Sequence, residues 1–150
     1  MKMITRLAAG AALVMAMTMG AAAPAMAQES SYKPGSVFEV SYIEVLPGQF
    51  ENYMDYLSDR WKKSNEFLKK EGVVLSYRVL AINNARDGEP TLMLMIEYKD
   101  YTTNAQKDAI GKKLNEYMTQ TDRSSETAAA ARGKMREQKG SIELQELVLK

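Results

Sequence analysis

The stretch Ser41–Trp61, SYIEVLPGQFENYMDYLSDRW, decides the fold because its hydrophobic pattern changes period in the middle. Its first part continues a run of alternating β-branched and aromatic residues, which predicts a strand over 37–46. Pro47 then removes an N–H that a ladder needs, and Gly48 permits a tight turn. Apolar residues recur at helical spacing after this break, which predicts a helix over 49–70. The Pro-Gly junction is therefore interpreted as a corner of the fold rather than as a catalytic loop.

The rest of the chain repeats these patterns and predicts one small α+β domain. Two strands joined by a turn-rich connection predict a hairpin, and a helix and a last strand follow it. The resulting order is β-α-β-β-α-(α)-β, the ferredoxin-like or split β-α-β plan with a four-stranded antiparallel sheet. The predicted elements are strands over 73–82, 91–99 and 142–149, a connection over 83–90, a helix from Thr102 or Thr103 to about Met118 with Ile110 and Leu114 inward, and a short, largely exposed helix over 125–138.

The N-terminal segment has the composition of a secretory signal peptide. Lys2 and Arg6 precede an apolar run, and the small residues Ala25 and Ala27 have the spacing that signal peptidase recognises. Cleavage is expected after Ala27, which predicts export to the periplasm, with full secretion as the alternative. No later segment has the apolar length of a membrane span. The predicted division is a signal peptide over 1–27, a flexible lead-in over 28–36 and a single domain over 37–150.

Composition excludes several classes of chemistry. The chain contains no Cys and no His, which removes disulfides, thiol nucleophiles, Ser-His-Asp triads and ordinary zinc sites. A site built from carboxylates alone stays open, but no loop has the spacing of a calcium site, so no metal and no cofactor is expected. The formal net charge is +1, and such a near-neutral chain gives no electrostatic reason to expect a nucleic-acid partner.

Two segments carry a family resemblance: YIEVLPGQFENYMDY, from Tyr42 to Tyr56, and LMLMIEYKDYTTNAQ, from Leu92 to Gln106. They resemble the dimeric α/β-barrel superfamily, whose best-known branch is the antibiotic-biosynthesis-monooxygenase-like proteins. The resemblance implies that two sheets meet face to face in a homodimer. Many members carry a His near the position of Gln106, so their His-dependent chemistry, haem ligation included, is not expected here. Trp61 and Asn65 resemble by type and rough location the Trp and Asn of cofactor-free monooxygenases.

Strict alternation along the first three strands predicts the candidate site. It places Glu39, Arg78 and Glu97 on one sheet face, where the guanidinium would pair with both carboxylates or offer a fork to a ligand. A cross-strand ion network without any ligand is the simpler interpretation. No catalytic residue can be assigned. The candidate ligand-binding residues are Glu39, Ser41, Trp61, Asn65, Tyr77, Arg78, Met93, Met95 and Glu97.

The predicted strand over 91–99 is apolar on both faces, which bears on assembly. A lone ferredoxin-like unit covers only one sheet face with helices, so the other face would expose an apolar patch unless a partner covered it. A homodimer is therefore expected. The leading interpretation is a periplasmic homodimeric barrel that binds a small hydrophobic or aromatic molecule. The alternatives are a cofactor-independent monooxygenase-like or isomerase-like enzyme, and a structural or interaction protein with a filled barrel.

Overall fold

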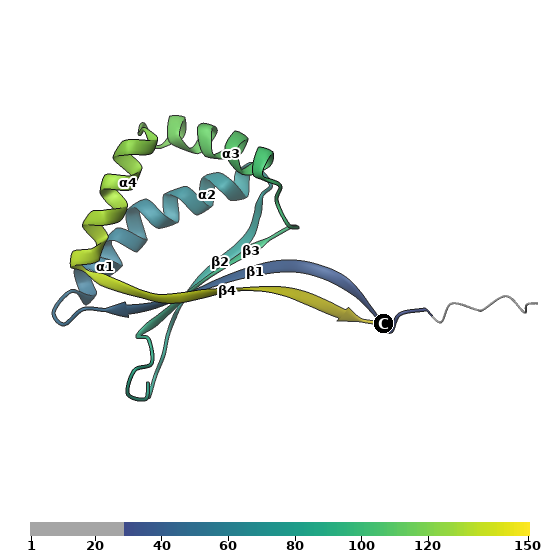
Figure 1. Ribbon diagram of the computed structural model, residues 1–150, viewed down its shortest axis with the longest axis horizontal. Helices are drawn as coiled ribbons and strands as arrows, with labels where there is room; N and C mark the ends of the chain where they lie inside the picture. Colours follow the sequence, from purple (N-terminus) through teal and green to yellow (C-terminus); the bar gives the residue numbers. More distant parts are fainter. Residues whose placement is uncertain (1–28) are drawn as a thin grey trace, which may run out of the picture.

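The computed structural model describes residues 29–150. The predicted signal peptide lies outside this range. Figure 1 shows a sheet with helices packed along it. The elements are β1 (Tyr32–Val45), α1 (Phe50–Tyr56), the π-helical segment η1 (Leu57–Trp61), α2 (Lys62–Lys70), β2 (Val74–Ala81), β3 (Leu92–Tyr98), α3 (Asn104–Tyr117), α4 (Asp122–Ala131), the short 3-10 helix η2 (Arg132–Lys134) and β4 (Arg136–Leu149).

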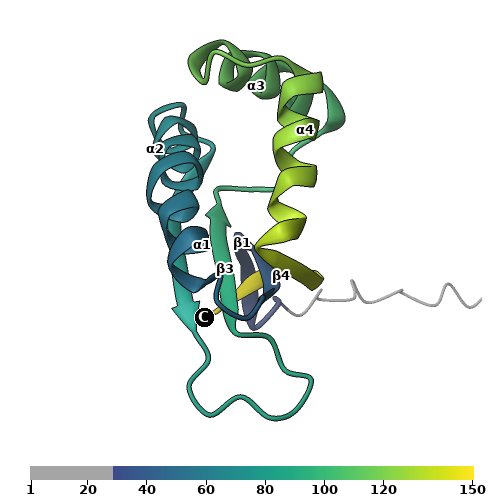
Figure 2. The ribbon, with the colours of Figure 1, turned by 90° about the vertical axis from the view of Figure 1, so that its left-hand side faces the viewer.

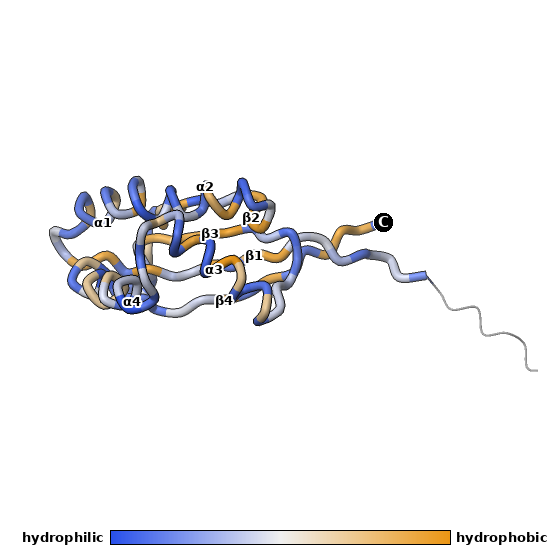
Figure 3. The backbone as a smooth tube through the Cα atoms, turned by 90° about the horizontal axis from the view of Figure 1, so that it is seen from above, coloured by the Kyte–Doolittle hydropathy of each residue, from blue (hydrophilic) through white to orange (hydrophobic). Residues whose placement is uncertain are grey.

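The four strands form one antiparallel sheet in the order β2-β3-β1-β4. This is the strand order of the ferredoxin-like plan, so the predicted α+β fold class is confirmed. All the helices cover the same face of the sheet. Figure 2 shows α1 and α2 on one side of that face and α3 and α4 on the other. Figure 3 shows hydrophobic positions concentrated along β1 and β3, as expected for the two central strands.

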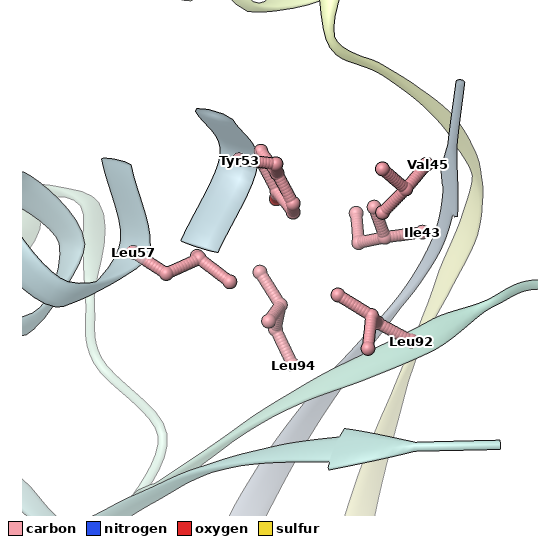
Figure 4. Packing of buried hydrophobic residues seen from close by; sticks show 6 residues of the cluster. All are labelled: Ile43, Val45, Tyr53, Leu57, Leu92 and Leu94. Atoms are coloured by element: carbon pink, nitrogen blue, oxygen red, sulfur yellow. The ribbon is translucent and has the colours of Figure 1, made fainter. Parts of the chain in front are cut away.

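The main hydrophobic core lies at the end of the sheet that α1 covers. Tyr53 and Leu57 point from the helix toward the sheet and are 1% and 2% exposed. Figure 4 shows them against Ile43 and Val45 of β1 and Leu92 and Leu94 of β3. Burial of an aliphatic or aromatic side chain contributes about 1.5–3 kcal/mol, so this cluster anchors the helices to the sheet.

The helix after Pro47-Gly48 contains a π-helical segment that keeps one side of the helix on the sheet. Tyr53, Leu57, Trp61 and Asn65 follow one another at intervals of four residues. In a regular α-helix each such step drifts by about 40°, because one turn takes about 3.6 residues. A π-turn holds more residues per turn, so η1 absorbs part of this drift. Asn65 consequently faces the interior and is buried.

Two boundaries differ from the predictions because strand pairing outweighs local sequence. β1 begins at Tyr32, so most of the predicted lead-in is strand, and Tyr32 pairs with Leu149 of β4. β4 begins at Arg136, inside the segment predicted as an exposed helix over 125–138. That helix is α4, which starts earlier because Thr121 and Ser124 form its capping box.

Candidate functional site

Two of the cavities on the helix-covered face meet at the middle of β1. The larger lies between the sheet and α3, and the smaller lies near α1 and η2. Glu39, at the middle of β1, lines both of them. The larger cavity has a volume of about 460 Å³ and is lined by Val37, Glu39, Leu68, Val73, Tyr98, Asp100, Tyr101, Thr102, Lys107, Ile110, Gly111, Leu114 and Glu143.

The larger cavity exists because α3 does not pack closely on the sheet. No residue of α3 is buried, and the inward residues Ile110 and Leu114 are only half-buried. Gly111 adds to the free space, since a Cβ built there would meet nothing within 4 Å. A cavity of this volume falls within the usual range of small-molecule sites, roughly 300–1,000 Å³.

Polar groups gather on the sheet side of the larger cavity. The Tyr98 hydroxyl lies 3.4 Å from the Glu39 Oε2 and donates a long hydrogen bond to it. Burial raises the pKa of Tyr98 well above its usual value, and the Glu39 carboxylate adds to the rise. Tyr98 therefore stays a neutral donor at neutral pH. Because a hydroxyl-to-carboxylate bond is normally about 2.5–2.7 Å, the long contact leaves this donor available to a better acceptor.

The smaller cavity has a volume of about 160 Å³ and a different character. Aromatic side chains of α1 and η1 form one wall, and two arginines from η2 and β4 form another. Ser41 places a hydroxyl on its sheet side. The full lining is Glu39, Ser41, Ile43, Tyr53, Tyr56, Trp61, Leu94, Ile96, Arg132, Arg136 and Gln138.

The two arginines of the smaller cavity pack over tyrosine rings. The guanidinium carbon of Arg132 lies 5.1 Å from the ring centre of Tyr56, and that of Arg136 lies 6.0 Å from the ring centre of Tyr53. Burial raises the pKa of Tyr53, and the charge of Arg136 opposes part of this rise. These cation–π contacts hold both guanidinium groups against the aromatic wall.

Trp61, Asn65 and Tyr77 lie together on the helix-covered face, as the sequence predicted for the first two. The rings of Trp61 and Tyr77 meet edge to face at 5.3 Å. The Asn65 Nδ2 donates to the Trp61 carbonyl at 2.9 Å, whereas its buried Oδ1 has no hydrogen-bond partner. The Tyr77 hydroxyl donates to Glu66 at 2.5 Å, and this bond raises the pKa of Tyr77 to about 12.

The predicted Glu39–Arg78–Glu97 cluster is wrong, because its members lie on opposite faces of the sheet. Residues that pair directly across antiparallel strands share a face. Glu39 pairs with Ile96, whereas Glu97 pairs with Phe38. Glu39 therefore faces the helices, and Glu97 and Arg78 face the opposite, open side. Ser41 goes with Glu39 because it pairs with Leu94, while Met93, Met95 and Ser76 lie on the open face with Glu97.

The open face has a small polar cluster of its own. Glu97 accepts hydrogen bonds from Ser76 at 2.6 Å and from Ser36 at 2.8 Å. These two bonds lower the pKa of Glu97, and Arg78 adds only a minor contribution. Among residues 29–150, neither Glu97 nor Arg78 forms an ion pair within 4 Å. Serine hydroxyls therefore hold Glu97, and Arg78 is exposed.

Sequence reasoning missed most of the residues that line the two cavities, and four of these carry polar groups on which the site depends. Tyr98 and Glu143 lie on the sheet side of the larger cavity, and Arg132 and Arg136 lie in the smaller one. Tyr98 follows Glu97 directly, so correct pairing of β1 with β3 would have found it opposite Val37. The two arginines occupy a polar segment with no periodic signal, and only the return of the chain to β4 brings them under α1.

Comparisons with known proteins leave the family open. No protein-family model and no curated protein matches the chain. One similar solved structure is the crystal structure of HapK from Hahella chejuensis, with 13% identity and a TM-score of 0.49. The likeness covers 73% of this chain and 91% of that one. The fold assignment accordingly rests on the strand order and register described above.

Within residues 29–150 no helix is long and apolar enough to cross a membrane. The same residues contain no cluster of three or more metal-ligating side chains.

Proposed function

We propose that this is an exported, homodimeric protein that binds a small, mainly apolar or aromatic molecule in the larger cavity. The observation that carries the proposal is the space of about 460 Å³ between α3 and the sheet. Its walls combine aliphatic side chains with a few convergent polar groups, which is the usual composition of a small-molecule site. The site proposed from sequence lay inside a barrel, whereas this cavity lies on the helix-covered face.

The polar groups restrict the kind of molecule that fits. Glu39, Asp100 and Glu143 are all carboxylates, and Lys107 is the only cation among the lining residues. An anionic group would meet repulsion there, whereas a phenol or alcohol can donate to a carboxylate and accept from Tyr98. The expected ligand is thus a neutral ring system that carries at least one hydroxyl group.

The homodimer is supported by the open face of the sheet. Ile142 and Leu144 of β4 are 41% and 46% exposed there, and Leu80 at the other edge is also exposed. Soluble monomers rarely leave several large apolar side chains together on one sheet face in water. Packing of this face against the same face of a second copy would bury it and close a barrel. The apolar residues of the open face are Phe38, Val40, Tyr42, Leu80, Met93, Met95, Ile142 and Leu144.

Cofactor-independent catalysis is the second candidate function, and one specific observation favours it. The buried Oδ1 of Asn65 has no partner, although most buried polar atoms in proteins have one. Asn65 lies along the helix between Trp61, which lines the smaller cavity, and Leu68, which lines the larger cavity. A substrate hydroxyl could donate to the Asn65 Oδ1 while Glu39 takes a proton from the other end and the neutral Tyr98 hydroxyl donates a hydrogen bond to it.

A cavity-filling variant tests the binding proposal. The neutral dye N-phenyl-1-naphthylamine is expected to bind the wild-type protein, with a rise in fluorescence. Gly111→Leu should abolish this rise, because the new side chain enters the larger cavity. Ala105→Leu makes a comparable change on the exposed side of α3 and should leave binding unaltered. Equal binding by both variants would place the dye outside the larger cavity and contradict the proposal, and no binding by the wild type would favour a structural role with no ligand.

Catalysis is tested separately by the consumption of dioxygen with a hydroquinone in the presence of a metal chelator. Activity that Asn65→Ala lowers, while dye binding persists, would support an enzyme. If dioxygen is consumed no faster than in buffer alone while the dye still binds, the protein is a binding module and not an enzyme.

Light scattering tests the homodimer. A monomer mass at micromolar concentration would contradict the proposed dimer.

A further inference from the structure

The smaller cavity contains two guanidinium groups that lack acidic partners. The Nε atoms of Arg132 and Arg136 are buried, and neither has a hydrogen-bond partner. Among residues 29–150 neither arginine forms a salt bridge, and Arg136 makes one side-chain bond, to Gln138 at 3.3 Å. A buried donor without an acceptor is destabilising, and more so when it is charged. An incoming acceptor would recover this free energy.

The charges around the two cavities differ in sign. Arg132 and Arg136 outnumber Glu39, the only carboxylate that lines the smaller cavity. The Glu39 carboxylate also lines the larger cavity, where it accepts a hydrogen bond from the Tyr98 hydroxyl. The smaller cavity therefore carries a net positive charge, and it favours an anion where the larger cavity disfavours one.

Size and wall chemistry narrow the class of anion further. A volume of 160 Å³ is close to that of an apolar cavity of about 150 Å³ that holds benzene, so one ring fits. Tyr53, Tyr56 and Trp61 border the cavity and supply aromatic contacts for that ring, and Ile43 and Leu94 supply aliphatic contacts. Arginine forks suit the planar, two-oxygen geometry of a carboxylate. Ser41 adds a hydroxyl that can donate to the same group.

We propose that the smaller cavity is a binding site for the carboxylate of a single-ring aromatic acid. Arg132 and Arg136 hold the carboxylate, and the ring lies against the tyrosines and Trp61. The inference rests on the smaller cavity alone and does not require a ligand in the larger one.

Three probes of similar shape test the charge requirement. Benzoate, benzamide and benzylamine differ mainly in charge, which is negative, neutral and positive. Trp61 is the only tryptophan of the chain and lines the cavity, so its fluorescence reports occupancy directly. Benzoate should change this fluorescence in a saturable manner, while benzamide and benzylamine bind about tenfold more weakly or not at all. Equal responses to benzoate and benzamide would overturn the proposal.

Variants that remove one charge each test whether Arg132 and Arg136 bind the carboxylate. Arg132→Gln and Arg136→Gln should each raise the Kd for benzoate by about tenfold or more, because each removes a charged donor. Arg123→Gln makes the same change on the exposed part of α4 and should leave the Kd unaltered. Thermal unfolding shows whether each variant is folded. Unaltered benzoate affinity in both cavity variants would overturn the proposal, and if neither variant folds, the three-probe comparison on the wild type decides.

Discussion

The two ends of the helix-covered face differ in how closely the helices meet the sheet. At the α1 end, Tyr53 and Leu57 are almost fully buried against β1 and β3. At the α3 end no helical residue is buried, and a cavity separates helix and sheet. The contrast shows how a small fold divides its tasks. One end supplies stability through close packing, and the other gives up contacts and leaves the space in which we propose that a ligand binds.

The largest expected effect compares one leucine from each end. Leu57→Ala should lower the free energy of unfolding by about 2–5 kcal/mol, because it leaves a cavity in a packed core. Leu114→Ala on α3 should cost only about 1 kcal/mol, because its side chain already borders a cavity. Urea unfolding of both variants measures the difference. Similar losses would show that the α3 end is packed as closely as the α1 end.

A smaller effect of opposite sign is expected for glycine on α3. Gly111→Ala should raise the free energy of unfolding by about 0.5–1 kcal/mol, because alanine favours a helix and its Cβ meets nothing. Gly72, which follows α2, has a φ of +74°. Gly72→Ala should therefore cost about 1–2 kcal/mol. Urea midpoints measure both changes, and a loss of stability in Gly111→Ala would mean that the larger cavity is not open there.

Alkaline pH should lower the stability of the protein, because a buried tyrosine at each end of the helix-covered face resists deprotonation. The folded protein holds the protons of Tyr98 and Tyr53 to higher pH than the unfolded chain, whose tyrosines titrate near pH 10. The stabilisation is complete below about pH 10 and is lost as pH rises through the folded pKa values. Tyr98→Phe should flatten this decline, whereas Tyr101→Phe, at an exposed position, should not. The same pH dependence in both variants would place the Tyr98 hydroxyl in solvent.

The smallest expected effect concerns the pKa of Glu97, which lies on the open face and belongs to neither end of the helix-covered face. Ser76→Ala removes the closer hydroxyl from Glu97, so the pKa of that carboxyl should rise toward its usual value. Because a lowered pKa contributes stability that is lost as pH falls, the variant should lose less stability on acidification than the wild type. NMR titration of the Glu97 carboxyl measures the pKa. An unchanged pKa would show that Ser76 does not donate to Glu97 in solution.

Local signals predicted the fold, whereas the site depended on pairing that is not local. The change of period within Ser41–Trp61 and the hairpin pattern were sufficient for element order and fold class. Alternation shows which residues of one strand share a face. It does not show which residues of the neighbouring strand lie on that same face, because this depends on the register between the strands. Glu39 and Glu97 were therefore placed on one face, although the pairing of β1 with β3 separates them.

Irregular pairing also limited the prediction of the site. A register shift lies between Val74 and Ser76, so Val74 is buried under the helices while Ser76 lies on the open face. Strict alternation would group these two residues, because they are two positions apart on one strand. Arg132 and Arg136 reach the smaller cavity because the chain turns through η2 into β4, which no periodic pattern in their segment indicated. Trp61 and Asn65 were found because a single long helix carries both.

The π-helical segment constrains the length of the chain more than its composition. Ser58 and Asp59 are exposed, so replacement of either side chain should have little effect on folding. Deletion of one residue from Leu57–Trp61 would instead rotate everything after it by about 100° relative to α1. Trp61 and Asn65 would then leave the interior, and the polar neighbours of each would take their places. Divergent copies of this chain should accordingly vary in sequence at these positions but keep the spacing between Leu57 and Asn65.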